Sequence, residues 1–318
     1  MRTLARPALL ARRPVRALLA QWPLAVSGEV EGIHQARVAS RRLRELVPAL
    51  AHPRDAPEAR RLRRGLRVIT RLLGRSRELD VALETLAAIE ARAPSLGAPA
   101  AAVRDHIGRE RAEAGRAAHA QAQAVDIGGL ADGVLALAAR NVTPAAARGC
   151  VRRVSARLGR RAGELEKSVV VAGLIFAPGP LHAVRIAMKK FRYALEVAER
   201  LGRFRLTGSM RRLKYLQNLL GDLHDLQVLG GLVRDVEAQA TGASRRQLEA
   251  LVKTVDREIR ALHGRFVTER DSIVVLLARA TGLRRALAAM PPPAAPVHPA
   301  RRTGLASSSI QAPGRRRR

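Results

Sequence analysis

A basic helical segment that occurs twice constrains this chain more than any other feature of its sequence. Residues 33–47 read IHQARVASRRLRELV, and residues 181–195, which lie 148 positions later, read LHAVRIAMKKFRYAL. A second pair of segments, 66–81 and 213–228, shares a Leu-Leu-Gly at an offset of 147. Because two separate segments agree to within one residue, we predict that the chain contains two copies of one helical unit.

Each copy of the first segment is amphipathic. Ala36, Leu43 and Leu46 recur at helical spacing on one side of the first copy, and Val184 and Phe191 lie on the same side of the second. The opposite side of each copy carries a histidine and a column of arginines or lysines. We expect the apolar sides to pack into a core and the basic sides to face solvent or a ligand.

The remaining sequence also predicts helices, so the expected fold class is all-α. Aromatic residues make up only 2% of the chain, which disfavours a β-sandwich because sheets favour aromatic and β-branched side chains. Prolines are expected to end the first long helix at Pro48 and Pro53, and Gly74 to end the next. Apolar periods and breaks predict helices at 30–47, 58–73, 76–93, 98–124, 130–140, 145–170, 180–201, 208–220, 222–238, 243–266 and 270–289.

Basic residues dominate the charge of the chain. It has 58 Lys and Arg against 27 Asp and Glu, a formal net charge of +31, and such a chain repels itself and favours a polyanionic partner. The single Cys150 excludes a disulfide framework and a cysteine zinc site, and it suggests a reducing compartment. We therefore expect a cytoplasmic protein without a metal or cofactor. No apolar run approaches the roughly 18 residues that a membrane span needs.

Composition divides the chain into three parts. Residues 1–25 are predicted to form a basic N-terminal segment or helix, and residues 291–318 a disordered tail rich in Pro and Arg. The main helical domain spans 26–290, with repeat halves at about 26–140 and 175–290. Because the first part is rich in arginine and free of acids, an organellar transit peptide stays open as an alternative there. The sequence predicts no oligomeric state.

The candidate binding residues are the cations and histidines of the repeated basic faces. A single charged helix face would ordinarily be ascribed to solvent exposure, but such faces usually mix both signs because like charges at i,i+4 repel. The recurrence of like-charged neighbours in both copies indicates that an anionic ligand offsets this repulsion. The predicted polyanion-binding residues are His34, Arg37, Arg41, Arg42, Arg44, Arg60, Arg64, Arg67, Arg71, His182, Arg185, Lys189, Lys190, Arg192, Arg211 and Lys214.

The repeated segments resemble the CHAD family, the conserved histidine α-helical domain. The resemblance rests on HxxRxxxRRLR at 34–44, on HxxRxxxKKFRY at 182–193 and on the two Leu-Leu-Gly segments, and it covers roughly residues 26–289. It implies two bundles of long antiparallel helices, related by a pseudo-twofold axis, whose basic helices face a shared groove or pore. It also implies binding of inorganic polyphosphate, often at polyphosphate granules. The ExExK motif of the CYTH domain found in many relatives is absent, so we expect a stand-alone module.

Two other functions compete with polyphosphate binding. A nonspecific nucleic-acid-binding protein fits the net charge, but the scarcity of aromatic residues disfavours single-strand binding, and no homeodomain, zinc-finger or basic-zipper pattern occurs. A phosphohydrolase would use the His224-Asp225 pair to hold a metal, but no Mg²⁺-binding carboxylate cluster or Gly-rich phosphate loop accompanies it. Asp225 is instead expected as a favourable charge in the first turn of its helix. We therefore expect non-catalytic polyphosphate binding, with a granule-surface scaffold as a compatible role.

Overall fold

The computed structural model describes residues 7–291, and it confirms the all-α fold class. Within this range the chain forms α-helices and two short 3-10 helices, and no strand. The 3-10 helices are η1 (Pro53–Asp55) and η2 (Pro94–Leu96). The α-helices are α1 (Ala8–Val26), α2 (Val30–Leu50), α3 (Ala56–Leu72), α4 (Gly74–Arg92), α5 (Gly97–Ala122), α6 (Ile127–Ala139), α7 (Pro144–Ala172), α8 (Pro178–Gly202), α9 (Thr207–Gln239), α10 (Gly242–Glu269) and α11 (Asp271–Ala289).

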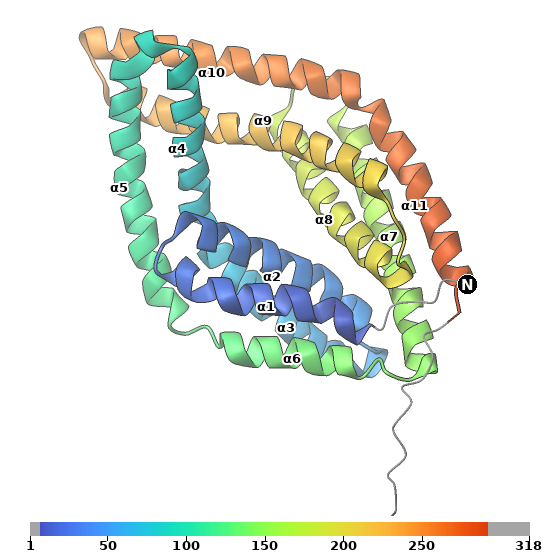
Figure 1. Ribbon diagram of the computed structural model, residues 1–318. Coiled ribbons are helices and arrows are strands. Elements are labelled where there is room, and N and C mark those ends of the chain that lie inside the picture. Colours follow the sequence, from blue (N-terminus) through green and yellow to red (C-terminus); the bar gives the residue numbers. More distant parts are fainter. Residues whose placement is uncertain (1–6, 292–318) are drawn as a thin grey trace, which may run out of the picture.

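Two hydrophobic cores hold the helices together. The larger core is built chiefly from α1, α2, α3, α6, α7, α8, α11 and the first part of α9, whereas the smaller one lies between α4, α5, α10 and the second part of α9. In Figure 1, α4 and α5 connect the α1–α3 group to α9 and α10 on one side, and α7, α8 and α11 lie on the other. Each core therefore combines helices from both sequence halves.

The sequence offset relates the helices of the two halves in chain order. An offset of 147–148 aligns α2 with α8, α3 and α4 with α9, α5 with α10, and α6 with α11. The pseudo-twofold axis implied by this order stays a prediction. The apolar faces on which the alignment rests are buried in both halves, since Leu43 and Leu46 of α2 and Phe191 and Leu195 of α8 all lie in the core.

The helix that contains Pro48 does not end there, contrary to expectation. α2 continues to Leu50, and the backbone N–H of Ala51 still donates to the carbonyl of Val47. Arg153 Nε donates to the carbonyl of Ala49 at 2.9 Å, and Asn141 Nδ2 donates to that of Leu50, also at 2.9 Å. A proline removes one intrahelical hydrogen bond, and side chains outside α2 satisfy carbonyl groups that the end of a helix leaves free.

The expected break between 208–220 and 222–238 is also wrong, because α9 is one continuous helix. Leu219, Leu220, Leu223 and Leu226 are all buried, and their burial outweighs the roughly 1 kcal/mol that Gly221 costs within a helix. Asp225 consequently lies in the middle of α9, not in a first helical turn.

A helix ends before Gly74, as expected: α3 ends at Leu72 with Leu73 as its C-cap, and Gly74 is at the same time the first residue of α4. Arg37 Nη1 donates to the carbonyl of Thr70 in the last turn of α3 at 2.6 Å. A Cβ at position 74 would lie 3.4 Å from that same Nη1 atom, so Arg37 lies directly against the α3–α4 junction.

The two ends of the chain differ in how much of them the structure describes. Most of the predicted N-terminal basic segment is α1, which buries Leu10, Val15 and Leu18 in the larger core and is therefore part of the helical body. Beyond Pro291, the predicted tail at 291–318 lies outside the described residues. Among residues 7–291, no helix is by itself long and apolar enough to cross a membrane. The segments Pro94–Ala122 and Ile127–Ala139, which are bent by 65° relative to each other, reach that length and apolar character only when taken together.

A buried ion-pair network ties α2 to α7 inside the larger core. Glu45 is 5% exposed, and it accepts hydrogen bonds from Arg157 Nη2 at 2.9 Å and from Arg161 Nε at 2.7 Å. Burial opposes the ionisation of Glu45, but the hydrogen bonds from Arg161 and the charge of Arg157 outweigh it and lower its pKa. Removing one partner of such a network leaves buried charge without compensation.

We predict that Glu45→Gln lowers the free energy of unfolding by about 3 kcal/mol, because two arginines lose their carboxylate. Urea denaturation followed by circular dichroism measures this change. Glu166→Gln, at an exposed position of α7, is the matched control and should change stability by less than about 0.5 kcal/mol. A loss below about 1 kcal/mol for Glu45→Gln would show that the network does not hold α2 to α7.

Candidate functional site

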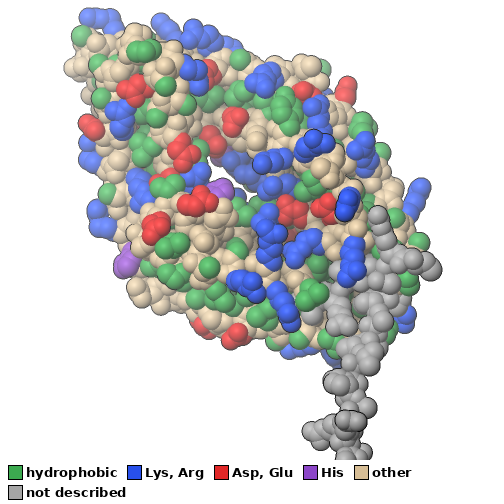
Figure 2. All heavy atoms as spheres, viewed as in Figure 1, with side chains coloured by type: hydrophobic (Ala, Val, Ile, Leu, Met, Phe, Trp, Pro, Cys, Tyr) green, Lys and Arg blue, Asp and Glu red, His purple; other side chains and the backbone are tan. Residues whose placement is uncertain are grey.

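Cations of the two repeated segments converge where α2 faces α8. We call Arg37 and Arg41 of α2 together with Arg185 and Lys189 of α8 the central basic cluster. Arg37, Arg41 and Arg185 all act electrostatically on Lys189, and Arg185 acts on Arg37. α4 and α9 border the same region, and Figure 2 shows a hollow there with Lys and Arg side chains on its walls.

The central basic cluster is partly buried, which makes its charges costly. Burial is the main cause that lowers the pKa of Lys189 to about 7, and the charges of Arg185 and Arg41 lower it further. Burial and the neighbouring Arg41 and Arg77 lower the pKa of Arg37 to about 10. Positive charge at this place is therefore held against both desolvation and mutual repulsion.

One hydrogen bond and one weak ion pair fix Arg37 and Arg185 of the cluster. Arg37 is anchored to the carbonyl of Thr70, a neutral acceptor that does not cancel its charge. Arg185 Nη2 lies 3.5 Å from Asp225 Oδ1 on α9, while the buried Nε of Arg185 has no hydrogen-bond partner among residues 7–291. Burial raises the pKa of Asp225, although Arg185 and Lys189 oppose this effect.

The histidines of the repeated segments lie at the edge of the cluster. His182 Nδ1 and His224 Nδ1 are 3.3 Å apart, and burial, Arg185 and His182 lower the pKa of His224 to about 4. Burial followed by Arg185 lowers the pKa of His182, and burial followed by Arg77 lowers the pKa of His34. These imidazoles are therefore neutral at neutral pH, and each keeps one N–H donor.

The environments of the two copies correspond to each other. At the repeat offset, Arg77 and Glu78 of α4 align with His224 and Asp225 of α9. Glu78 favours the charged form of Arg37, and Asp225 favours that of Arg185 in the same way. Arg77 lowers the pKa of His34, and His224 lies against His182 at the equivalent place.

Not all predicted binding residues belong to the central basic cluster. Arg44 forms a second group with Arg63 and Arg67. Burial is the main cause that lowers the pKa of Arg44, and the charges of Arg67 and Arg63 lower it further. Arg42 pairs with Glu196 at 3.0 Å and so links α2 to α8, and Arg192 lies 3.8 Å from the same carboxylate. Lys190 is half-buried without an ion pair to a described residue. The structure exposes the others to solvent: Arg60, Arg64, Arg67, Arg71, Arg211 and Lys214.

Sequence reasoning missed four residues of this region. Arg63, Arg77, His224 and Asp225 were not among the candidates, although all four lie beside predicted ones. The alignment of 66–81 with 213–228 contained the signal, because it places Arg77 opposite His224. Each residue of that pair comes one helical turn after the Leu-Leu-Gly and faces a histidine that is itself repeated.

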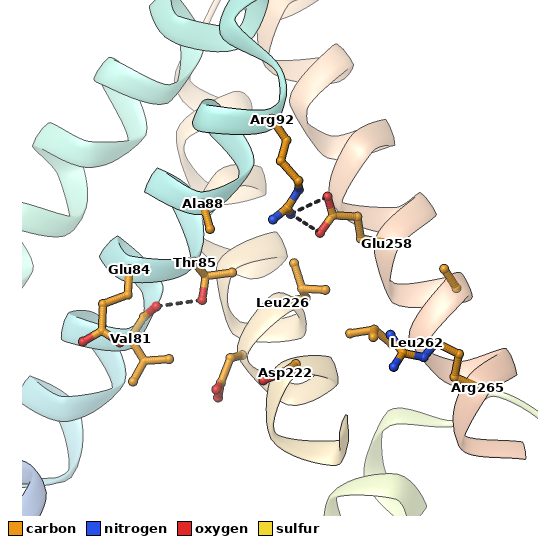
Figure 3. Close-up of a pocket in the computed structure, with 12 residues that line it drawn as sticks. Val81, Glu84, Thr85, Ala88, Arg92, Asp222, Leu226, Glu258, Leu262 and Arg265 are labelled. Carbon is orange, nitrogen blue, oxygen red and sulfur yellow. Dashed lines mark hydrogen bonds and ion pairs between the residues drawn. The ribbon is translucent and has the colours of Figure 1, made fainter. Parts of the chain in front are cut away.

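A pocket beside the cluster has the opposite character. It lies between α4, α9 and α10, has a volume of about 540 Å³, and has Glu84, Asp222 and Glu258 on its walls (Figure 3). Glu258 accepts two hydrogen bonds from Arg92 Nη2, both at 2.7 Å. Arg92 and Arg265 also line it, and it shares Asp225 with the surroundings of the cluster, so four carboxylates face two arginines and the pocket borders the candidate site on its acidic side. Among residues 7–291, no three His, Cys, Asp or Glu side chains are grouped to hold a metal.

Comparison with known proteins identifies the family. The profile of the CHAD domain matches residues 10–234, more than half of the chain. The chain belongs to the CHAD family. The match begins within α1, so this helix lies inside the CHAD region.

Two solved structures have the same fold. The CHAD domain from the plant Ricinus communis is 23% identical, with a TM-score of 0.57 and coverage of 87% of this chain and 92% of that one. PptA from Streptomyces chartreusis is 20% identical, with a TM-score of 0.57 and coverage of 89% and 100%. No curated protein was found to match this chain.

We predict that Lys189→Met makes the CHAD domain more stable at pH 7, by about 1–3 kcal/mol, because it removes a buried ammonium from among three arginines. The pKa of Lys189 is about 7 in the folded protein and about 10.5 in the unfolded chain, so folding expels a proton. The destabilisation is complete below pH 7 and vanishes as the pH rises through 10.5. Thermal and urea denaturation at pH 6, 8 and 10 should therefore show a gain that shrinks with pH. A pH-independent gain would mean that apolar packing, not the charge, explains it.

Proposed function

We propose that this CHAD protein binds inorganic polyphosphate, without catalysis, through the central basic cluster. The observation that supports the proposal most directly is that both repeats bring cations to one place. Arg37 and Arg41 come from the first repeat, and Arg185 and Lys189 from the second. A single extended polyanion can contact both pairs at once, which strengthens binding through effective concentration.

The electrostatics of the cluster favour a ligand with many negative charges. Against its four cations stand Glu78 and Asp225, and burial raises the pKa of Asp225. An anionic ligand would offset the repulsion that depresses the pKa of Lys189, and it would favour the charged form of that side chain. Binding energy is therefore available from the relief of an unfavourable arrangement in the free protein.

The types of side chain favour polyphosphate over nucleic acid. Guanidinium groups form bidentate hydrogen bonds with phosphate oxygens, and neutral histidines supply further N–H donors. Recognition of single-stranded nucleic acid needs exposed aromatic rings for base stacking. Tyr193, next to Arg192 on α8, is buried and its ring lies under the Arg192 guanidinium, so it is not available for stacking. Polyphosphate has neither bases nor sugars and needs no such ring.

The cellular role follows from the ligand. A cytoplasmic protein that binds long polyphosphate through a non-catalytic cluster would be retained at polyphosphate granules, where it could act as a surface scaffold. Nonspecific binding of nucleic acid is the competing function, because the net charge of +31 attracts any polyanion.

We predict that Arg41→Glu combined with Arg185→Glu weakens long-chain polyphosphate binding about 100-fold, since two charge-assisted contacts are lost and two repulsive charges replace them. Fluorescence anisotropy with end-labelled polyphosphate measures the affinity, and circular dichroism checks the fold. Arg116→Glu combined with Arg148→Glu changes the net charge equally at exposed positions of α5 and α7. If this control weakens binding as much, diffuse electrostatics and not the cluster binds the ligand.

In direct competition at matched phosphate concentration, we expect long-chain polyphosphate to bind more tightly than duplex DNA or RNA at every salt concentration. The logarithm of each affinity should fall linearly with the logarithm of the salt concentration, because phosphate neutralisation releases counterions. Equal or tighter binding of either nucleic acid would favour the competing function.

A further inference from the structure

A second pocket, lined by arginines, lies away from the central basic cluster. It has a volume of about 600 Å³ and is formed where the end of α2 and η1 meet the end of α6 and the start of α7. Its wall includes Leu50 of α2, whereas the nearest residue of the central basic cluster on the same helix is Arg41. Nine residues of α-helix rise about 14 Å, so the two places are separate sites along α2.

Four arginines line this pocket, and they differ in what else they bind. Arg140 Nη1 is neutralised by Asp55 at 2.8 Å and by Glu58 at 2.7 Å. Arg54 and Arg152 are exposed; the nearest carboxylate to Arg54 is that of Asp55, at 4.0 Å, and Arg152 has no ion-pair partner among residues 7–291. Arg54 and Arg152 are therefore the cations of the pocket that are free to bind an anion.

Arg153 is held rigidly beside these two arginines. Its Nε and Nη2 donate to the carbonyl groups of Ala49 and Leu50 and to Asn141 Oδ1. A Cβ at position 149 would lie 3.0 Å from Arg153 Nη1 and 3.9 Å from Arg152 Nη2, so both guanidinium groups reach over Gly149. The glycine leaves room for two neighbouring guanidinium groups at the pocket wall.

Two neutral features add hydrogen-bond donors and positive potential. His52 Nδ1 accepts from the backbone N–H of Arg54 at 3.4 Å, which assigns the proton of a neutral imidazole to Nε2 and makes that atom a donor. α7 begins at the pocket with Pro144 after the capping residue Thr143, and its first turn has no acidic residue. The positive end of the α7 dipole is therefore not neutralised by its own helix.

The remaining wall of the pocket is mostly apolar. Leu50, Pro53, Ala145, Ala146 and Ala156 line it, together with Asn141 and with the Asp55 carboxylate, which Arg140 neutralises. The volume lies in the range that accommodates small organic ligands. A bare anion would use the arginines and leave this wall in contact with water, whereas a phosphorylated organic molecule would use both.

We propose that this pocket is a second binding site, specific for a small phosphate-bearing molecule and independent of the polyphosphate site. The phosphate would lie against Arg54, Arg152 and the free Nη1 of Arg153, near the start of α7. The ligand chemistry is a phosphate group, supplied either by a mononucleotide-sized organic phosphate or by a short inorganic oligophosphate. The apolar wall favours the organic phosphate.

Isothermal titration calorimetry of the full chain at 150 mM salt tests the proposal, with AMP and sodium tripolyphosphate as separate probes. We expect at least one probe to bind, and we expect Arg54→Ser combined with Arg152→Ser to weaken its binding at least tenfold. Tighter binding of AMP would assign the site to organic phosphates, and tighter binding of tripolyphosphate to oligophosphates. Both substituted arginines are exposed, so the variant should fold, which circular dichroism verifies.

Two controls separate this site from the central basic cluster and from general electrostatics. Arg109→Ser combined with Arg116→Ser removes the same charge from exposed positions of α5 and should leave probe binding unchanged. Arg41→Glu combined with Arg185→Glu should leave AMP binding unchanged while reducing polyphosphate binding, so failure of one proposal does not imply failure of the other. Tripolyphosphate can also bind the central basic cluster, so its binding to the pocket is measured in the Arg41→Glu, Arg185→Glu background. The second site does not exist if neither probe binds there, if the α5 control weakens binding as much as the pocket variant, or if the cluster variant abolishes AMP binding.

Discussion

Apolar packing holds like charges together in this protein. α2 and α8 each bury an apolar face, rich in leucine and alanine in both and with Phe191 in α8, and this fixes the direction of the opposite face whatever its charge. Burial of a leucine or phenylalanine side chain contributes about 1.5–3 kcal/mol, and the partly buried ammonium of Lys189 costs a similar amount, about 1–3 kcal/mol. Because apolar burial occurs many times and the charge cost only a few times, the helices pack despite the repulsion, and the charges stay concentrated.

The two halves of the chain depend on each other for stability. Glu45 of α2 is buried against Arg157 and Arg161 of α7, and Arg42 of α2 pairs with Glu196 of α8. Both hydrophobic cores also contain helices from both repeats. A half-chain would therefore leave apolar surface and charged groups unpaired. The same arrangement places the candidate site between the repeats, so neither repeat contains it alone.

The polar groups around the central basic cluster hold its arginines in place without cancelling their positive charge. Arg37 is anchored to a carbonyl group and Arg185 to a carboxylate that is itself partly buried, so position is fixed while positive potential is kept. Histidines at the edge stay neutral and add directional donors. The pocket on α4, α9 and α10, lined by four carboxylates and two arginines, limits the positive region on one side.

The sequence by itself determined the all-α class, the positions of most helices and the basic faces of α2 and α8, because these follow from local periodicity. It also carried the repeat that indicated the CHAD family. It did not determine that α9 is continuous, because this depends on burial of the leucines around Gly221 against other helices, nor that α2 continues past Pro48, where residues distant in sequence bind the last carbonyl groups. Nor did it distinguish Arg37, Arg41, Arg185 and Lys189, which converge, from exposed residues such as Arg60 and Lys214. Only the tertiary structure decided this, because the distance between two cations on different helices depends on how those helices pack, and a helical period contains no such information.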